Sequence, residues 1–521
     1  MSRSSSSTDA TETPDATPTA RRTFVALGAL AAASFIPRTA RAQQGRPRKS
    51  RPTDRVEPPN VPPQPGVAPG ENAAAFAEWD TGGLSRLVRR MTMGMTGADL
   101  AQANQMGWNG YLNYQLNYSR IDDSAVENWI AAHYPYLVKP TAELVLINYD
   151  DVFDQLRGAS MYRAVFSKRQ LFQRMVEFWT DHFNQDRNKV ESLLVNDQRD
   201  VIRKYAMTTF PQLLKASAHS GSMMVYLDQN VSDAKAPNQN YAREIMELHT
   251  LGVDGGYTQN DVAELSRVLT GWTVDHDGDF AYNPSLHDTK DKVVLGTTIK
   301  GQSGAAGQQE GEAVLDLLVN HPSTARFIAT KMLKWMVTPT PTVAQISGIA
   351  AVYRATGGDI KAMLRAMLNE QWVSQAPMKL KRPFHYAVSA LRSLNPSVTS
   401  TKPVDEGLMQ LLGHEAYVWD TPDGYPDKID YWAGSILPRW QCATTLSQFQ
   451  SSATIAVDTA PYRAGSPAAA VDLIDHNFFG GEMPVTFRTA LLSYAGTTTL
   501  TDAKVRELLA LAISSNAFHW Y

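Results

Sequence analysis

The chain has 521 residues, of which 43% are hydrophobic and 19% charged, a composition typical of a globular protein large enough for two or three domains. Its formal charge of −3 lacks the basic excess of most nucleic-acid-binding proteins, so we expect no nucleic-acid partner. Cys442 is the only cysteine, which excludes an internal disulfide, a thiolate metal cluster and c-type haem attachment.

The first 42 residues have the order of a twin-arginine signal peptide. A polar segment precedes Arg21-Arg22, the apolar stretch over 24–36 is too short to span a bilayer, and Ala40-Arg41-Ala42 offers a small-x-small cleavage site. The alternative is a buried helix that opens a cytoplasmic domain, but its polar and proline-rich neighbours offer it nothing to pack against. We therefore predict a signal peptide over 1–42 and a periplasmic or extracellular protein exported by the twin-arginine pathway.

A proline-rich segment follows the predicted cleavage site. Residues 43–70 combine eight prolines with several arginines, a composition that favours solvated, extended chain over helix or strand. We predict a disordered linker over 43–75. No later stretch approaches about 18 uninterrupted apolar residues, so we expect no transmembrane span in the mature chain.

From about residue 76 the apolar residues recur at helical spacing. Leu84, Leu87, Val88 and Met91 fall at i, i+3, i+4 and i+7. Strand-like alternation is scarce and is clearest at 291–295. We predict a mostly α, multi-helix globular domain over 76–521 with at most a short β-hairpin. Long loops of the kind that are often functional separate its helices at about 275–312, 395–407 and 413–435.

The densest group of chemically active side chains lies at 238–252. Asn240 is a candidate N-cap for a helix that carries Glu244 and Glu247 three residues apart. Carboxylates this close repel, which raises one pKa unless a cation or metal lies between them, so the pair is typical of acid–base work or of a divalent metal site. The alternative is a structural ion pair between Arg243 and Glu247, four residues apart on the same helix.

Two histidine clusters accompany this helix. In Trp179-Thr180-Asp181-His182 the histidine lies on the apolar stripe of its helix, where a hydrogen-bonded core residue is more frequent than a ligand or base. In His287-Asp288, which follows Gly271-Trp272, an imidazole beside a carboxylate can shuttle protons, although loop histidines are often only solvated.

Several common catalytic signatures are absent from the sequence. It contains no His-Glu-x-x-His zinc helix, no Gly-x-Ser-x-Gly nucleophile elbow, no Walker phosphate loop and no Gly-x-Gly-x-x-Gly dinucleotide motif. No sequence motif therefore points to one of the common hydrolase, kinase or dinucleotide-dependent reactions. The cofactor stays open, with a divalent metal as one candidate.

The three clusters belong to a longer series of motifs in which the chain resembles the bacterial domain-of-unknown-function family 1800. The resemblance covers about residues 80–520 and names no activity; exported members are frequent in the family, which agrees with the amino terminus here. The sequence departs from the expected pattern at Asp423, where an asparagine is expected. The matching segments are Leu87-Val88-Arg89-Arg90, Phe178-Trp179 with His182-Phe183, Asn240 to Gly252, Tyr257-Thr258, Leu269 to Trp272, His287-Asp288, His321 to Phe327, Asp423-Gly424-Tyr425-Pro426, and Trp432 with Arg439-Trp440.

We expect an exported hydrolase or lyase that acts on a polymer of the envelope or surroundings, such as a polysaccharide. The alternative is a non-catalytic envelope binding or assembly factor with a co-exported protein partner, which would use the glutamates in salt bridges. Convergence of His182, Glu244, Glu247 and His287 on one solvent-connected pocket would favour the enzyme, and scattered positions or full burial with arginine partners would count against it. The candidate catalytic residues are Glu244, Glu247, His182 and Asp181, and the candidate substrate-binding residues are Trp179, Arg243, His249, Trp272, His287, Asp288 and Tyr425.

Overall fold

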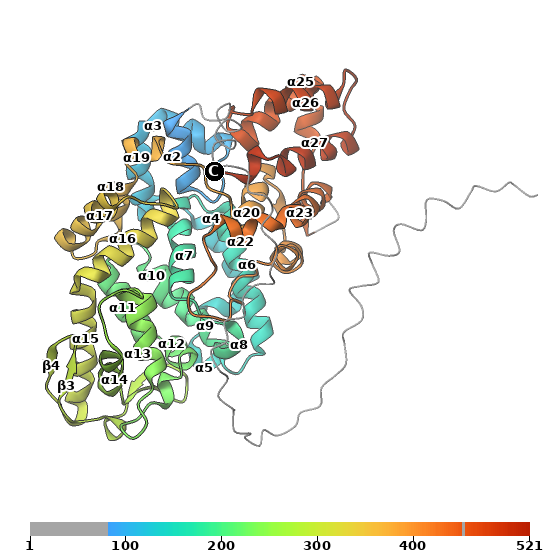
Figure 1. Ribbon diagram of the computed structural model, residues 1–521. Coiled ribbons are helices and arrows are strands. Elements are labelled where there is room, and N and C mark those ends of the chain that lie inside the picture. Colours follow the sequence, from blue (N-terminus) through green and yellow to red (C-terminus); the bar gives the residue numbers. More distant parts are fainter. Residues whose placement is uncertain (1–81, 451–453) are drawn as a thin grey trace, which may run out of the picture. The chain divides into compact units, whose positions relative to one another are not determined.

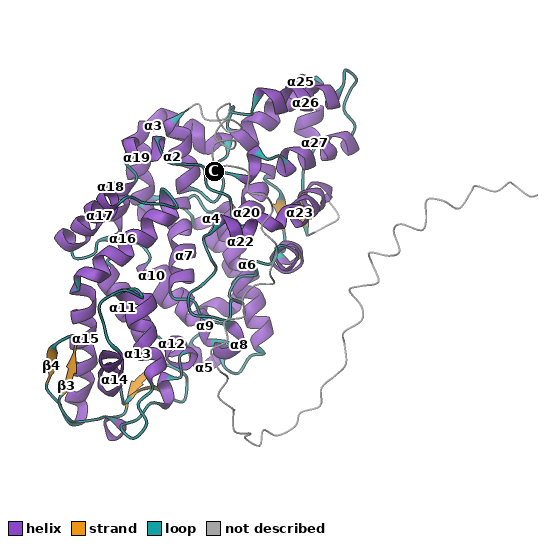
Figure 2. Cartoon of the chain, in the orientation of Figure 1, coloured by secondary structure: helices purple, strands orange, loops and turns teal. Residues whose placement is uncertain are grey.

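The computed structural model of the protein describes residues 82–450 and 454–521, all within one compact unit, Ala68–Tyr521. The predicted signal peptide (1–42) and linker (43–75) lie outside the described residues. Helices dominate this part of the chain (Figure 2), which confirms the predicted mostly α fold. Within it, no helix combines the length and the apolar character needed to cross a membrane.

Most of the helices are short and follow one another closely along the chain (Figure 1). Those of the first half are α2 (Gly83–Met91), α3 (Gly97–Leu116), α4 (Ser124–His133), α5 (Thr141–Leu144), α6 (Tyr149–Phe166), α7 (Gln170–His182), α8 (Arg187–Val190), α9 (Leu193–Asn196), α10 (Arg203–Tyr205), α11 (Phe210–Ala218), α12 (Gly221–Tyr226), α13 (Gln239–Glu244) and α14 (Gln259–Val268). Those of the second half are α15 (Gln308–Asn320), α16 (Pro322–Met336), α17 (Val343–Thr356), α18 (Ile360–Met367), α19 (Glu370–Ser374), α20 (Pro383–Leu394), α21 (Met409–Leu411), α22 (Ile429–Trp432), α23 (Ile436–Gln448), α24 (Ala460–Arg463), α25 (Pro467–Ile474), α26 (Val485–Ala495) and α27 (Asp502–Ser514).

Turns of wider π helix and tighter 3₁₀ helix connect or extend these helices. A π turn holds more residues than an α turn and therefore rotates the side chains that follow it. The π turns are Asp197–Ile202, Ile245–Thr250, Pro403–Leu408 and Asp475–Phe479. The 3₁₀ turns are Tyr118–Arg120, Pro135–Val138, Gln229–Val231, Pro284–Leu286, Gly304–Gly307, Ala433–Ser435 and Ala517–His519.

The strands form three separate two-stranded antiparallel pairs. In the first two, β1 (Trp272–Val274) pairs with β2 (Phe280–Tyr282) and β3 (Lys292–Val294) with β4 (Thr297–Ile299), with Trp272 opposite Tyr282 and Lys292 opposite Ile299. In the third, β5 (Ser397–Val398) pairs with β6 (Ile455–Ala456). The predicted strand at 291–295 is confirmed by β3, and the predicted loop 275–312 also contains β2 and β4.

Helix α2 buries both its apolar stripe and its arginines. Leu87, Val88 and Met91 are fully buried, as the spacing predicts. Arg86 and Arg90 lie off that stripe and are buried as well, because their guanidinium groups donate to carbonyls of distant segments: Arg86 to Ser374 and Ala376, each at 2.6 Å, and Arg90 to Tyr521 at 2.9 Å. Helix α2 therefore organises the core through charged side chains as well as apolar ones.

Two hydrophobic cores fill the described unit. The first contains the apolar faces of α2, α3, α7, α11 and α14–α18. The second contains α20, α23, α25 and α27 together with Met161 and Val165 of α6. Phe166, at the end of α6, packs against both cores. Helix α7 contacts α2, α3 and α6, so its carboxyl end is held firmly where the candidate site lies.

Candidate functional site

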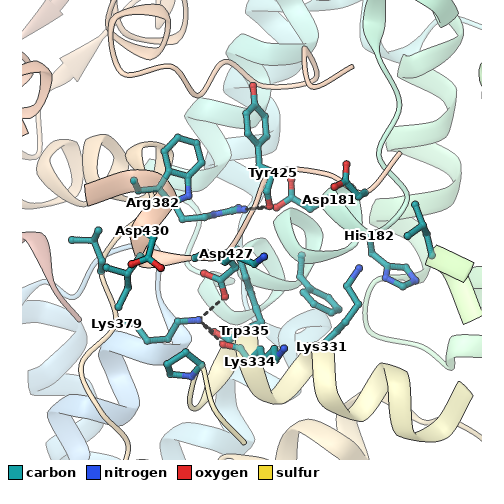
Figure 3. A pocket seen from close by; sticks show the side chains of 18 of the residues that line it. Asp181, His182, Lys331, Lys334, Trp335, Lys379, Arg382, Tyr425, Asp427 and Asp430 are labelled. Carbon is teal, nitrogen blue, oxygen red and sulfur yellow. Dashed lines mark hydrogen bonds and ion pairs between the residues drawn. The ribbon is translucent and has the colours of Figure 1, made fainter. Parts of the chain in front are cut away.

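A pocket of about 610 Å³ opens between α7, α16 and the segment that runs from Asp423 into α22 (Figure 3). Its size is within the usual range for small-molecule and substrate sites. Segments far apart in the sequence build it, so folding brings together side chains that no local motif combines. The lining residues with polar or charged side chains are Asp181, His182, Lys331, Lys334, Lys379, Arg382, Asp423, Tyr425, Asp427, Lys428, Asp430 and the indole-bearing Trp335 and Trp432.

Helix α7 contributes one face to the pocket. Phe178, Asp181 and His182 are spaced at i, i+3 and i+4, which places them together on that face. Trp179 points elsewhere: it is fully buried, and its indole nitrogen donates to the carbonyl of Ala206 at 3.0 Å. The structure therefore separates Trp179 from its neighbours Asp181 and His182.

Asp181 is held by a buried arginine. Arg382 donates to carboxylate oxygens of Asp181 and Glu177, each at 2.6 Å. Burial raises the pKa of Asp181 to about 6, against the opposing pull of Arg382. Burial alone would lower the pKa of Arg382, but the two carboxylates raise it above its usual value. Asp181 is thus a fixed carboxylate that takes up a proton at only mildly acidic pH.

His182 is buried, with 1% of its surface exposed. Its Nε2 lies 3.1 Å from the carbonyl oxygen of His249 and therefore carries a proton that it donates. Its Nδ1 has no hydrogen-bond partner among the described residues. Burial lowers the pKa of His182 far below its usual value, and the nearby Lys331 and His249 lower it further. His182 is accordingly a neutral imidazole with an unused lone pair at the pocket wall.

Helix α16 forms the facing wall. Phe327, Lys331, Lys334 and Trp335 are spaced at i, i+4, i+7 and i+8, so all four lie on the face that lines the pocket. Figure 3 shows Lys331 and Lys334 projecting from the same helix. Lys331 is half-buried and forms neither a hydrogen bond nor an ion pair with any described residue. Its ammonium lies 5.6 Å from the centre of the Phe327 ring.

The charge of Lys331 is sensitive to its surroundings. Burial lowers the pKa of Lys331 to about 8, while Asp181 and Asp423 oppose this shift. The same lysine lowers the pKa of His182. Lys331 lines the same pocket as Asp181, His182 and Asp423, and its lowered pKa makes it a cation that releases its proton slightly above neutral pH.

Lys379 and Arg382 lie in the pocket wall beside Trp335. Lys379 donates to Asp427 at 2.8 Å and to the carbonyl of Trp335 at 3.0 Å. The Trp335 ring lies between cations, with the guanidinium groups of Arg174 and Arg382 each 4.5 Å from its centre. Since Lys379 and Arg382 each have a carboxylate partner, they give this wall rigidity without leaving their charge unbalanced.

The segment at 423–425 is fitted tightly against the carboxyl end of α7. Gly424 has a positive φ of 73°, and a Cβ atom there would lie 2.2 Å from the carbonyl oxygen of Asp181. Tyr425 lines the pocket and donates its hydroxyl to the carbonyl of Glu415 at 2.7 Å. Asp423 also lines the pocket and accepts hydrogen bonds from Thr421 at 2.5 Å and Trp419 at 3.2 Å.

Glu244 and Glu247 lie beside this pocket, which their neighbour Leu248 lines. Burial, together with the charges of Glu247 and Asp423, raises the pKa of Glu244 to about 7. Glu247 accepts a hydrogen bond from Tyr257 at 3.1 Å. Neither glutamate forms an ion pair with a described residue, and Arg243 instead donates to Gln259 at 2.9 Å. The structure thus couples Glu244 to the pocket through Asp423.

The N-cap of this helix differs from the prediction. Asn238, two residues before Asn240, accepts the capping hydrogen bond from the backbone of Asn240. The α helix ends at Glu244 and continues as the π turn Ile245–Thr250. His249 lies in that turn, is buried, and supplies the carbonyl that accepts from His182.

Trp272, His287 and Asp288 lie in the region of the first two strand pairs, outside the lining of the α7–α16 pocket. Trp272 is fully buried and stacks on His219 at 5.0 Å. His287 contacts Glu310 at 3.1 Å and donates to the carbonyl of Thr270 at 2.7 Å. Asp288 accepts from Arg267 at 2.8 Å.

Sequence reasoning missed the basic side chains of the pocket, which are Lys331, Lys334, Lys379, Lys428 and Arg382. The helical spacing of Phe327, Lys331 and Trp335 was the available signal, because a lysine that shares a face with large aromatic residues is more often partly buried than one on a polar face. The described residues contain no group of three or more His, Cys, Asp and Glu side chains arranged to hold a metal ion.

Comparison with known proteins identifies the family of the chain but no activity. A family model described as "Protein of unknown function (DUF1800)" matches residues 86–520, which confirms the resemblance seen in the sequence. No curated protein and no solved structure matches the chain.

Proposed function

The chain belongs to the DUF1800 family, and we propose that it is an enzyme, a hydrolase or lyase that acts on a polymer by acid–base catalysis in the α7–α16 pocket. One observation carries the proposal: Asp181, Lys331 and Asp423 reach a single pocket and influence one another there. Titratable groups with displaced pKa values that meet in a cavity are typical of active sites.

Asp181 on α7 and Lys331 on α16 both have shifted pKa values, and their roles are complementary. The pKa of Asp181 is raised to about 6 and that of Lys331 is lowered to about 8, in both cases mainly by burial. Between these values Asp181 is ionised and accepts a proton, while Lys331 is protonated and donates one. Such a pair suits general base and general acid catalysis near neutral pH.

The other candidates have supporting roles in this proposal. Glu244 and Glu247 act through Asp423, whose charge helps to raise the pKa of Glu244. His182 and His249 are positioning residues joined by their hydrogen bond, and Tyr425 contacts the substrate. Arg243 supports the glutamate helix, Trp179 fills the core, and Trp272, His287 and Asp288 have no part in catalysis.

We further propose that the enzyme works outside the cytoplasm, with residues 1–42 as its twin-arginine signal. A polymer substrate fits that location because long polysaccharides are components of envelopes and their surroundings. The alternative of a non-catalytic envelope factor is not favoured, since it requires Glu244 and Glu247 to be used in salt bridges and neither forms one with a described residue.

The test is an activity screen of the purified protein against pooled polysaccharides and polymeric esters, with metal content measured. We expect Asp181→Asn and Lys331→Met each to lower activity by at least about 100-fold, the usual effect of losing a general acid or base. Asp316→Asn is the matched control, because its side chain is exposed on α15 and pairs only with Lys215. Equal activity in all the proteins would refute the site.

The pH profile provides a second test of the same proposal. Activity should be bell-shaped, with an acid limb near pH 6 as Asp181 is protonated and an alkaline limb near pH 8 as Lys331 loses its proton. In Lys331→Met any residual activity should lose the alkaline limb and keep the acid one. An unchanged profile in that variant would remove Lys331 from the mechanism.

A further inference from the structure

Three lysines of the α7–α16 pocket form no direct ion pair with a described residue. Lys331, Lys334 and Lys428 line it, and none of them forms an ion pair or a side-chain hydrogen bond with a described residue. Lys379 and Arg382 differ, because Asp427 and Asp181 lie 2.8 Å and 2.6 Å from them. The cations of the pocket wall are therefore held in direct ion pairs, whereas those toward its open side are not.

Carboxylates offset part of this charge, since Asp181 and Asp423 both favour the protonated form of Lys331. The pocket is nevertheless lined by more cations than carboxylates: Lys331, Lys334, Lys379, Lys428 and Arg382 against Asp181, Asp423, Asp427 and Asp430. Asp423 is engaged by the Thr421 hydroxyl and the Trp419 indole, and Asp430 lies at the exposed edge of the pocket. Arg382 is in direct contact with Asp181, and Lys331 is the cation without a direct ion pair that influences both Asp181 and His182. A half-buried ammonium without a partner is costly unless a ligand supplies the opposite charge.

An aromatic surface continues outward from the same opening. Trp419 and Tyr425 have ring centres 4.8 Å apart, Trp419 and Tyr431 5.9 Å, and Tyr431 and Trp432 4.6 Å. Tyr431 is 45% exposed, although an aromatic ring gains most when it is covered. A sugar ring can cover such a surface, because it presents a face of C–H groups while its hydroxyl groups stay in water.

We propose that the pocket binds an anionic polysaccharide, with Lys331 paired to a carboxylate or sulfate of one sugar and the aromatic surface stacked against neighbouring sugars. The inference rests on the proposed function, since it assigns the substrate class of that same site. A pocket of about 610 Å³ holds one or two sugar residues, so the rest of the chain must extend along the opening, where Tyr431 and Trp419 lie.

The experiment is calorimetric titration of the full chain with three oligosaccharides of equal length: an oligouronate, a sulfated oligoglucan and a neutral oligoglucan. We expect one or both anionic ligands to bind at least ten times more tightly than the neutral one, with affinity that falls as salt is added. The preferred anionic ligand distinguishes a carboxylate from a sulfate. Equal affinity for all three, or no binding at all, would overturn the inference.

Variants identify the cation that is responsible. Lys331→Met should lower the affinity for the anionic ligand about ten-fold, as expected for one charge-assisted contact, and leave the weak affinity for the neutral one unchanged. The control is Lys361→Met, a half-buried lysine of α18 outside the pocket. Circular dichroism spectra and melting temperatures of both variants show whether each has folded, and an equal effect of the two substitutions would contradict the assignment.

The binding data separate this inference from the proposed function. Tight binding of the anionic ligand without its cleavage, under the conditions of the activity screen, removes the enzymatic proposal and keeps the ligand class. Cleavage of a neutral polymer, with no preference for anionic chains, keeps the enzyme and removes the ligand class.

Discussion

At the scale of single residues, Arg382 has the most concentrated set of interactions in the pocket. Its guanidinium group reaches Glu177 and Asp181 at 2.6 Å each and lies 4.5 Å from the centre of the Trp335 ring. Buried carboxylates are tolerated only when a cation compensates them. Arg382 therefore allows two acids to sit in a largely buried position and fixes the orientation of one of them, Asp181.

The first prediction removes that cation. Arg382→Met leaves Glu177 and Asp181 without compensation, so the free energy of unfolding should fall by about 3–5 kcal/mol. Urea denaturation followed by circular dichroism measures the loss. Arg354→Met, at an exposed position on α17, should change stability by no more than about 0.5 kcal/mol. A similar small change in Arg382→Met would mean that the two acids are protonated or solvated.

The second prediction concerns the pH dependence of stability. Burial lowers the pKa of His249 from 6.5 to about 3, and Lys331 adds to the shift. The unfolded chain binds a proton below pH 6.5 that the folded chain does not accept until about pH 3, so His249 makes stability fall as the pH falls through that window.

His249→Gln removes this contribution. Relative to the unchanged protein, the slope of unfolding free energy against pH should decrease by about 1.4 kcal/mol per pH unit between pH 6 and 4. Denaturation at several pH values measures it. The control is His276→Gln, at a largely exposed histidine. If both variants have the slope of the unchanged protein, His249 is protonated in the folded state.

Some of these residues could be predicted from the sequence and others could not. The apolar stripe of α7 predicted the burial of His182, and the motif at 423–426 included Tyr425. The spacing of Lys331 with Phe327 and Trp335 indicates partial burial, but it does not show whether a pocket or another helix covers the lysine. Its environment depends on α7, which is far away in the sequence, and only packing brings the two helices together.

At the scale of elements, the pocket depends on the close fit between the segment around Gly424 and the last turn of α7. Gly424 needs its positive φ of 73°, and its missing side chain leaves room for the carbonyl of Asp181. Any larger residue must push the two elements apart. The positions of Asp423 and Tyr425 relative to Asp181 are therefore set by one glycine.

The third prediction tests this fit with two glycines. Gly424→Ala should destabilise the protein by about 2–4 kcal/mol, from an unfavourable backbone conformation and from the clash, and should weaken binding at the pocket. Gly413→Ala is the matched control: its φ is 68°, but a Cβ atom there would meet nothing within 4 Å. It should lose about 1 kcal/mol and keep its binding. Thermal melting and ligand titration distinguish the two, and equal losses would contradict a clash at Gly424.

Regular helices were the most predictable elements. The spacing of apolar residues predicted α2 and α7, which bury those residues. The π turn Ile245–Thr250 was not predictable, because its sequence has the same composition as an α helix and its wider turn depends on its neighbours. For this reason Glu247 and His249 are not where a strict α-helical period places them relative to Glu244.

At the scale of the whole molecule, buried arginines connect the two hydrophobic cores. Arg392 of α20 donates to Asp99 of α3 at 2.9 Å and to the carbonyls of Gly94 and Val165, each at 2.7 Å. Helix α20 belongs to the second core, whereas α3 belongs to the first. The sequence predicted the mostly α class from its helical periodicity, but this division into two linked cores comes from long-range contacts with no local signature.

The fourth prediction is that the two cores unfold together. We expect a single unfolding transition, and we expect Arg392→Met to broaden it, because the second core loses its hydrogen bonds to Asp99 of α3 and to the Val165 carbonyl of α6. Hydrogen exchange resolved by region measures this: α25 and α27 should exchange before α16 in the variant only. Arg463→Met, at an exposed arginine of α24, should preserve cooperative exchange. Separate exchange in the unchanged protein would show that the cores are independent.

The fit of Gly424 against Asp181 also affects when the protein becomes competent during synthesis. The ribosome synthesises α7 and α16 before residues 423–432. The pocket is therefore incomplete until residues 423–432 have been synthesised and have packed against α7. A nascent chain therefore contains Asp181 and Lys331 before it contains the outer edge of the pocket. Ligand binding is expected only in chains that extend beyond residue 432.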